Sequence, residues 1–329
     1  MRRRALASVA LLAMLAPACT IDAHGSPAPV AATEATGATT PLPGLAGSDA
    51  ALVALRVRPA PSAARPAPRP TLPDGSRRLF PDHRVVAFYG AAGSPVLGVL
   101  GTATADGLWP RLARQASAYR HRRVAVLPAY ELIAFVATSG HGNQGNYSTR
   151  VADSVIATYA RAARRHHALL LLDVQPGRGS FLHDAKSLRR WLLLPYVGLA
   201  LDPEWKLYGG ELPLTRIGHT DARSVNAVSR WLAALTAAHH LPQKLFVVHE
   251  FTADMVRNKA ALRAHRDLAT VFNVDGFGSR PAKIGKYDDF ARGHRFPLGF
   301  KLFYDKDVNL LGPAAVLKLH PAPVLVEYQ

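Results

Sequence analysis

Residues 168–205 read ALLLLDVQPGRGSFLHDAKSLRRWLLLPYVGLALDPEW, in which two short apolar runs each end at an aspartate. The runs cover residues 168–173 and 197–202. Uninterrupted apolar runs of this length are typical of parallel strands, because helices cover both faces of a parallel sheet. We therefore expect both runs to be buried strands of an α/β domain.

Runs of the same kind recur from residue 81 to residue 329, with helical stretches between most of them. The eight expected strands are residues 84–89, 132–138, 168–173, 197–202, 244–250, 269–275, 298–304 and 323–327. The expected helices are residues 108–119, 149–166, 224–240 and 253–265, with short ones near 287–292 and 313–319. Eight alternating units in about 250 residues predict a (β/α)8 TIM-type barrel. A doubly wound open sheet is the alternative.

The composition excludes several classes of protein. The chain has 329 residues, of which 49% are hydrophobic, and a formal net charge of +17. A single cysteine cannot form an internal disulfide or a cysteine zinc site. The basic residues are scattered, without a dense basic helix face, so we expect no nucleic-acid binding. A basic chain of this kind could adhere to acidic polymers or to anionic membrane surfaces.

The first residues have the pattern of an export signal. Three arginines at positions 2–4 precede an apolar stretch at residues 5–15, and small residues then lead to Cys19. We interpret residues 1–18 as a signal peptide. The segment before Cys19 resembles the lipobox of bacterial lipoproteins, which implies lipidation of Cys19 and membrane anchoring outside the cytoplasm. Cleavage without lipidation, giving a secreted protein, is the alternative.

Residues 19–80 are rich in alanine and proline, as in the run PAPRP at residues 66–70. Proline removes a backbone donor and disfavours helices and sheet interiors. We expect the lipidated Cys19 and a disordered linker in this segment, and the barrel domain in residues 81–329.

Carboxylates stand at the ends of several expected strands. The active sites of (β/α)8 barrels form at the C-terminal ends of the strands, so these acids should converge there. Like charges that lie close together raise one another's pKa, which suits a proton donor beside an ionised partner. The candidate catalytic residues are Asp202, Glu204, Glu250 and Asp275.

Other polar and aromatic residues at the same strand ends are candidates for substrate binding. They are Tyr89, Asp173, Gln175, Trp205, His249, Asn273, Lys301, Tyr304, Asp305 and Glu327. Side chains alternate along a strand, and a lysine within an apolar strand should point inward, so Asp305 should point inward with Lys301. His249 and Glu250 must face opposite ways, and the sequence leaves open which of them faces the interior.

The acidic strand ends carry a resemblance over residues 81–329. The barrel resembles those of glycoside hydrolases, and it is similar to uncharacterised bacterial lipoprotein domains with the segments LDPEW and NVDGFG, here residues 201–205 and 273–278. One hydrolase clan uses aspartates after strands four and six, which Asp202 and Asp275 match. Another uses glutamates after strands four and seven; Glu204 matches the first, but the seventh strand offers Tyr304 and Asp305.

Three functional hypotheses follow. The leading one is hydrolysis of a glycan by two carboxylates, about 5 Å apart for retention or about 6.5–9.5 Å apart for inversion. The second is a non-catalytic lipoprotein that binds a glycan or organises the cell envelope. The third is metal-assisted hydrolysis with Asp173, Asp202, His249 and Asp275 as ligands. Because no Gly-x-Gly-x-x-Gly follows the first strand and no Walker loop occurs, we expect no cofactor, and the leading reading includes no metal.

Overall fold

The computed structural model describes residues 69–121 and 124–329. Cys19, the expected signal peptide and most of the expected linker lie outside these residues, so their interpretation stays a prediction. Within the described part of the chain, no helix combines the length and the apolar character needed to cross a membrane.

Eight parallel strands form a closed barrel, which confirms the expected fold class. The strands are β1 (His83–Gly90), β2 (Ala125–Ala137), β4 (Leu169–Val174), β5 (Val197–Leu201), β7 (Lys244–Glu250), β9 (Leu268–Val274), β10 (Leu298–Leu302) and β11 (Leu325–Tyr328). Each strand pairs with its neighbour in this order, and β1 pairs with both β2 and β11, which closes the ring. The short strand β3 (Ser148–Arg150) pairs antiparallel with the end of β2.

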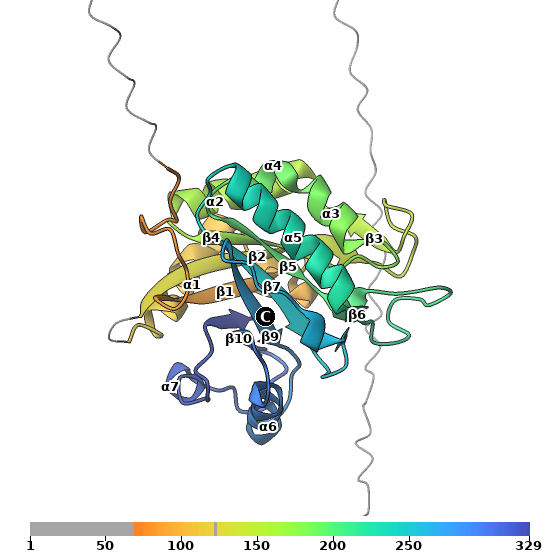
Figure 1. The fold of residues 1–329 in the computed structure, drawn as a ribbon. Helices are drawn as coiled ribbons and strands as arrows, with labels where there is room; N and C mark the ends of the chain where they lie inside the picture. Colours follow the sequence, from red (N-terminus) through yellow and green to blue (C-terminus); the bar gives the residue numbers. More distant parts are fainter. Residues whose placement is uncertain (1–68, 122–123) are drawn as a thin grey trace, which may run out of the picture. The chain divides into compact units, whose positions relative to one another are not determined.

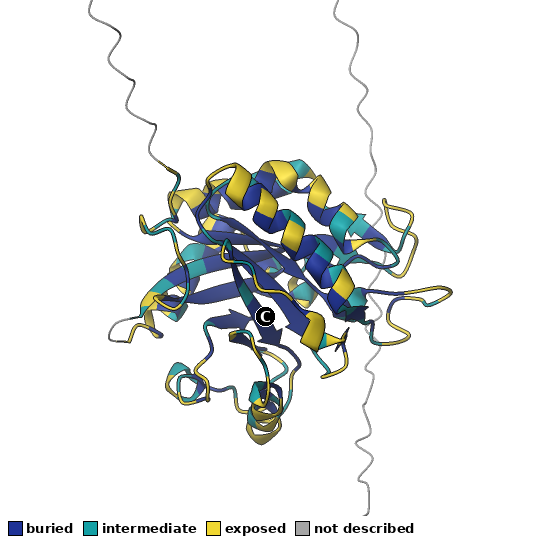
Figure 2. Cartoon of the chain, in the orientation of Figure 1, coloured by how far each residue is buried: buried dark blue, intermediate teal, exposed yellow. Residues whose placement is uncertain are grey.

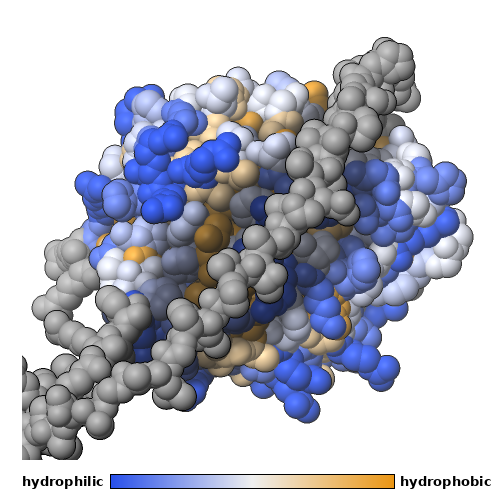
Figure 3. Space-filling view, turned by 90° about the horizontal axis from the view of Figure 1, so that it is seen from above, coloured by the Kyte–Doolittle hydropathy of each residue, from blue (hydrophilic) through white to orange (hydrophobic). Residues whose placement is uncertain are grey.

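Helices cover the outside of the barrel (Figure 1). They are α1 (Ala105–Ser117), α2 (Asp153–Arg165), α3 (Phe181–Ser187), α4 (Arg189–Leu192), α5 (Ala222–Ala238), α6 (Arg280–Ala291) and α7 (Pro313–Val316). Figure 2 shows that the strands are buried and that the long helices expose only their outer side. Seen from the side of α2, α4 and α5, hydrophilic residues cover much of the described surface (Figure 3).

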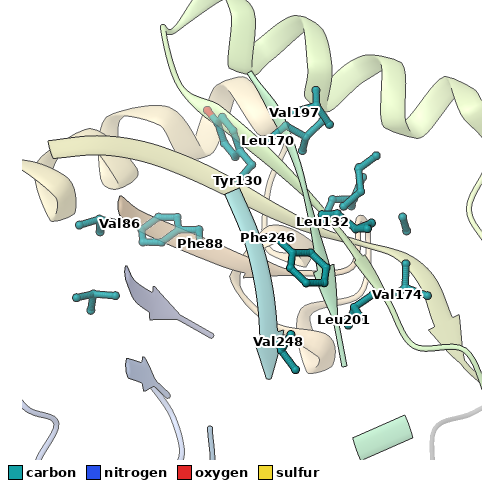
Figure 4. Packing of buried hydrophobic residues seen from close by; sticks show 14 of the residues in the cluster. Val86, Phe88, Tyr130, Leu132, Leu170, Val174, Val197, Leu201, Phe246 and Val248 are labelled. Atoms are coloured by element: carbon teal, nitrogen blue, oxygen red, sulfur yellow. The ribbon is translucent and has the colours of Figure 1, made fainter. Parts of the chain in front are cut away.

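Apolar side chains on the outer side of the strands pack beneath the helices. Figure 4 shows part of this cluster, including Phe88, Tyr130, Leu170 and Phe246 from four different strands. Burial of such side chains contributes roughly 25 cal/mol per Å² of apolar surface, so this layer is a main source of stability.

The inner side of the barrel is apolar only in its lower half, near the N-terminal ends of the strands. Val85, Leu169, Val247 and other small or branched residues fill this layer. The segment that enters β1 closes the same end, because its residues Leu72 and Leu79 join the apolar layer. Ordered packing therefore begins before residue 81, where we placed the domain boundary.

Two expected elements differ most from the structure. Among the others, the expected helix at residues 149–166 begins at Asp153, because residues 148–150 form β3, and the short helix expected near residues 287–292 is the longer α6. The expected helix at residues 253–265 is wrong: this region holds the short strand β8 (Val256–Arg257), paired with β6 (Thr220–Asp221), and a 3₁₀ turn at Lys259–Ala261. Asn258 between them has φ 57, a left-handed conformation that interrupts a helix. The second strand begins at Ala125, well before the expected residue 132, and so includes Glu131.

Candidate metal centre

A ring of polar side chains fills the upper half of the barrel, above the apolar layer. It consists of Tyr89, Glu131, Asp173, His249, Asn273, Lys301 and Glu327 from seven strands, with Asp202 and Asp275 directly after β5 and β9. All nine are between 0 and 6% exposed. The convergence expected for the strand-end acids is thus present, but it lies inside the barrel.

His249 is the centre of this ring. Its Nε2 lies 2.9 Å from Glu131 Oε1, and its Nδ1 lies 3.3 Å from Asp275 Oδ2 and 3.8 Å from Glu327 Oε2. Burial alone would lower the pKa of His249, but the carboxylates around it, with Glu327 first, raise that pKa well above its usual value. The structure therefore settles that His249, on β7, faces the interior.

Lys301 is the second buried cation of the ring. Its Nζ lies 3.1 Å from Asp275 Oδ2 and 3.9 Å from Glu327 Oε2, and 3.5 Å from the centre of the Tyr89 ring. Burial opposes the charged form, yet the carboxylates, with Asp275 first, raise the pKa of Lys301 above its usual value. Lys301 is therefore a permanent cation, unsuited to be a neutral amine nucleophile.

Lys301 and His249 affect the pKa values of Asp275 and Glu327 to different extents. Burial would raise the pKa of Asp275, but Lys301 and His249 outweigh burial and lower it. For Glu327, burial and the charge of Glu131 prevail, and its pKa rises well above the usual value. Asn273 Nδ2 also donates to Glu327 Oε2. Asp275 is thus the firmly ionised acid of the ring.

Asp173 and Asp202 form the other side of the ring. The hydroxyl of Tyr89 donates to Asp173 Oδ2 at 3.0 Å, and Gln175 Nε2 donates to that hydroxyl at 3.0 Å and reaches Asp202 Oδ2 at 3.5 Å. Burial raises the pKa of Asp173 to about 6, and burial together with Asp173 raises that of Asp202 to about 7.

Glu204 extends this acidic side towards the rim. It lies in a 3₁₀ turn at Pro203–Trp205 and is partly exposed. Burial, with the charges of Asp202 and Asp275, raises the pKa of the Glu204 carboxyl to about 8. These acids therefore exchange protons near neutral pH, which is the property expected of general acids and bases.

The ring carries more negative charge than its own cations balance. Five of its buried residues are acids, whereas only Lys301 and His249 can be positive. Among the described residues, Glu131 Oε2 and Glu327 Oε1 are buried without a hydrogen-bond partner. Leaving such oxygens unpaired costs about 1–3 kcal/mol or more each. A cation, or protons on the acids, must make up the difference.

Three residues of the ring have the geometry for a metal ion. Glu131, His249 and Glu327 each offer one ligand atom, and these atoms lie within 4.8 Å of one another. Imidazole and carboxylate ligands suit first-row divalent ions such as Zn²⁺ and Mn²⁺. His249 belongs to the ligand set that we expected for a metal, whereas Glu131 and Glu327 replace Asp173, Asp202 and Asp275.

Glu250 does not join the ring. Its side chain faces the helix layer, where Oε1 lies 2.6 Å from Lys259 Nζ and Oε2 lies 3.6 Å from His294 Nε2. Alternation along β7 sends His249 inward and Glu250 outward. The proposed catalytic role of Glu250 is corrected accordingly: it ties the connection after β7 to the barrel.

Three further candidates lie away from the ring. Tyr304 stacks on Tyr328 outside the barrel and donates its hydroxyl to Gln115 Oε1. Asp305 is exposed, because β10 ends at Leu302 and the alternation that we extended from Lys301 stops there. Trp205 is partly exposed, in the same turn as Glu204.

Glu131 is the ring residue that our sequence analysis missed. The sequence does hold a feature that predicts an inward-facing charge, because Glu131 stands in the middle of the apolar run AVLPAYELIAFVA. A charge within such a strand has to face a polar interior, as we argued for Lys301. We began this strand at residue 132 and therefore left Glu131 out.

Comparisons with known proteins find only solved structures of low sequence identity. No family model and no curated protein matches the chain. Similar solved structures include 2,3-dimethylmalate lyase, a PEP mutase/isocitrate lyase superfamily member, at 12% identity and TM-score 0.43, covering 75% of this chain and 76% of that one. Oxaloacetate acetylhydrolase matches at 12% identity and TM-score 0.44, with 75% of each chain covered. A hyperthermophilic endo-β-1,4-glucanase matches at 6% identity and TM-score 0.33, covering 62% of this chain and 77% of that one.

The glycoside hydrolase hypothesis and its glycan partner are wrong. The geometry overturns the hypothesis, because its acids Asp202 and Asp275 are only 2% and 6% exposed, and Asp275 is bound to Lys301 and His249. A polysaccharide needs acids on an open cleft. The glycan-binding alternative fails for the same reason.

Proposed function

We propose that this barrel is a metal-dependent enzyme that binds one divalent ion between Glu131, His249 and Glu327. It would act on a small polar molecule by hydrolysis or by bond lysis. The observation that carries the proposal is a buried imidazole beside two glutamates, each of which keeps a buried oxygen without a partner. Those two oxygens carry no hydrogen bond among the described residues, whereas His249 would exchange its contact with Glu131 Oε1 or with Asp275 Oδ2 for the ion.

The ligand chemistry narrows the choice of ion. One nitrogen and two carboxylate ligands favour Zn²⁺ or Mn²⁺ over Ca²⁺ and Mg²⁺, which prefer all-oxygen sites. Such an ion supplies Lewis acidity and lowers the pKa of a bound water. Glu131, His249 and Glu327 would hold such an ion, and three protein ligands are the number found in catalytic zinc sites.

The remaining ring residues would orient the substrate and carry protons. Lys301 is a fixed positive charge beside Tyr89, placed to neutralise an anionic group of a substrate. Asp202 and Glu204 extend from the ring towards the rim, and their raised pKa values suit proton transfer near neutral pH. Because the ring residues are 0–6% exposed and apolar side chains fill the barrel below them, the site has room only for a small molecule.

Metal titration tests this proposal directly. The purified full-length chain, stripped with a chelator, should bind about one Zn²⁺ or Mn²⁺ per chain by elemental analysis and calorimetry. Glu131→Gln and Glu327→Gln should each weaken binding at least about tenfold, because each removes a ligand charge. Asp184→Asn is the matched control, since Asp184 is a buried acid on α3 outside the ring. The loaded chain is then assayed on small esters, amides and carboxylic acids.

Two results would contradict the proposal. One is a chain that binds no ion in stoichiometric amount at any accessible concentration. The other is unchanged affinity in both glutamate variants, which would place the ion elsewhere. In either case the ring would hold no metal ion, and protons on its acids would balance their negative charge.

A further inference from the structure

A second feature lies at the opposite end of the barrel, where the strands begin. Each of the eight segments that lead into a barrel strand carries an exposed arginine, lysine or histidine. Six of these segments contribute the arginines that we call the basic face: Arg78, Arg120, Arg164, Arg189, Arg266 and Arg295. Among the described residues, only Arg266 of these six makes an ion pair, with Asp267 at 3.8 Å. The other five arginines have no carboxylate partner in that part of the chain.

The distribution of charge differs at the C-terminal end of the barrel. Exposed cations there, such as Arg223 and Arg257, are interspersed with exposed acids such as Asp254 and Asp305. At the end where the strands begin, the segment that leads into β1 also holds the exposed acids Asp74 and Asp82, but the exposed cations of the lead-in segments outnumber them. The positive charge is therefore concentrated on this end of the molecule, opposite the strand ends that Asp202 and Asp275 follow. Concentrated charge of one sign attracts extended surfaces of the other sign.

The chain also joins the barrel at the basic face. Residues 69–79 lie against this end, because Leu72 and Leu79 pack in the lower apolar layer and Arg77 Nη2 donates to His240 O at 3.0 Å. Residue 69, where the described part of the chain begins, therefore lies on this side, and residues 1–68 precede it in the sequence. Their sequence includes the expected export signal and Cys19, the residue that we expect to carry a lipid.

We propose that the basic face docks on a membrane surface rich in anionic lipid headgroups. Charge complementarity fits a membrane and a soluble polyanion equally, and the N-terminal connection on this side, which leads towards the expected lipid on Cys19, favours the membrane. Each arginine close to an anionic leaflet strengthens binding by about fivefold, so six together contribute a factor of about 10⁴. Binding of that strength is reversible by itself and becomes stable in combination with a lipid anchor such as the one expected on Cys19. Docking in this orientation leaves the opposite end of the barrel facing away from the membrane. The inference goes beyond the proposed metal chemistry and does not depend on it.

Vesicle pelleting tests this docking. The full-length chain is used with Cys19→Ser, so that no lipid is attached, and is mixed with vesicles of phosphatidylcholine alone or with about 30% phosphatidylglycerol. We expect binding only to the second kind, weakening as salt rises from about 0.05 M to 0.5 M because salt screens exposed charges. Arg164→Glu combined with Arg189→Glu should reduce affinity at least about tenfold. Arg223→Glu combined with Arg257→Glu, at the other end, should leave affinity within about twofold.

The outcomes separate the alternatives. Equal loss in both double variants would show a non-specific charge effect and overturn the assignment of the face. Equal binding to both kinds of vesicle would attribute binding to apolar residues instead. Binding to polyphosphate or DNA without binding to anionic vesicles would overturn the choice of a membrane. Circular dichroism of each variant verifies that the barrel is folded.

Discussion

Two buried lysines, Lys301 and Lys244, illustrate how the surroundings of a charge determine what it contributes. Lys301 lies among carboxylates, whereas Lys244 is 1% exposed in the lower half of the barrel and donates to the carbonyl of Leu194. Burial lowers the pKa of Lys244 to about 7. The first lysine neutralises its neighbours, and the second has no carboxylate partner among the described residues.

Replacing Lys301 by methionine should destabilise the protein. The variant leaves Asp275 and Glu327 without their cation in a buried site, and breaking a buried ion pair typically costs about 3–5 kcal/mol. Urea unfolding measures the change. Lys318→Met, at an exposed position, should change stability by less than about 0.5 kcal/mol. Equal effects of the two substitutions would show that the ring acids are protonated and need no cation.

Replacing Lys244 by methionine should stabilise the protein, and the gain in the free energy of unfolding should depend on pH. Because the folded pKa is about 7 and the ordinary value is 10.5, the unfolded chain binds more protons between these values. The stability of the wild-type protein should therefore rise with pH across this window, relative to Lys244→Met. Below pH 7 the variant should be more stable by a few kcal/mol, roughly 1.4 kcal/mol per unit of pKa difference at most.

Urea unfolding of both proteins at pH 6, 8 and 10 checks this. The difference between them should be largest at pH 6 and should shrink as pH rises. A constant difference across the three pH values would mean that Lys244 keeps its proton in the folded state.

At the scale of the strand, Gly299 shows how closely the elements pack around the ring. A Cβ atom at Gly299 would lie 2.5 Å from Asn273 Oδ1, in contact with the amide that donates to Glu327. Gly299→Ala should therefore displace Asn273 and destabilise the protein by about 1–3 kcal/mol. Gly285 in α6 has open space at the same position, and Gly285→Ala should stabilise by up to about 1 kcal/mol. Thermal unfolding of both variants measures their melting temperatures. Equal shifts in the two would contradict the close approach of Gly299 to Asn273.

The same scale shows where the sequence was informative. All eight barrel strands were expected near their observed places, because a strand buried on both faces leaves a run of apolar residues. The short β8 was not, since Ala253 and the residues after it fit a helix until Asn258 adopts a left-handed conformation. The pattern of neighbouring residues cannot predict the left-handed backbone angle of Asn258, because the tertiary structure imposes it.

Across the whole molecule, the sequence predicted that acids converge but not how deeply they lie. The position of Asp202 and Asp275 after their strands followed from the barrel topology. Whether those acids line an open cleft or a buried ring depends on how the loops cover the barrel, and on Glu131 from a strand that we began too late. The glycan hypothesis therefore failed on burial, a property that the order of residues along a strand does not encode.

The proposed ion would also link the ring to the stability of the whole molecule. A ligand that binds only the folded state stabilises it by RT ln(1 + [L]/Kd), which is about 2.7 kcal/mol when the ion is present at 100 times its Kd. We expect Zn²⁺ or Mn²⁺ to raise the melting temperature of the chelator-stripped protein by several degrees. Glu131→Gln should abolish the increase, because Glu131 supplies one of the three ligand atoms. Asp184→Asn should retain it. If Glu131→Gln shows the same increase as the wild-type protein, the stabilising ion binds outside the ring, and the charge excess of the interior is balanced by protons on its acids.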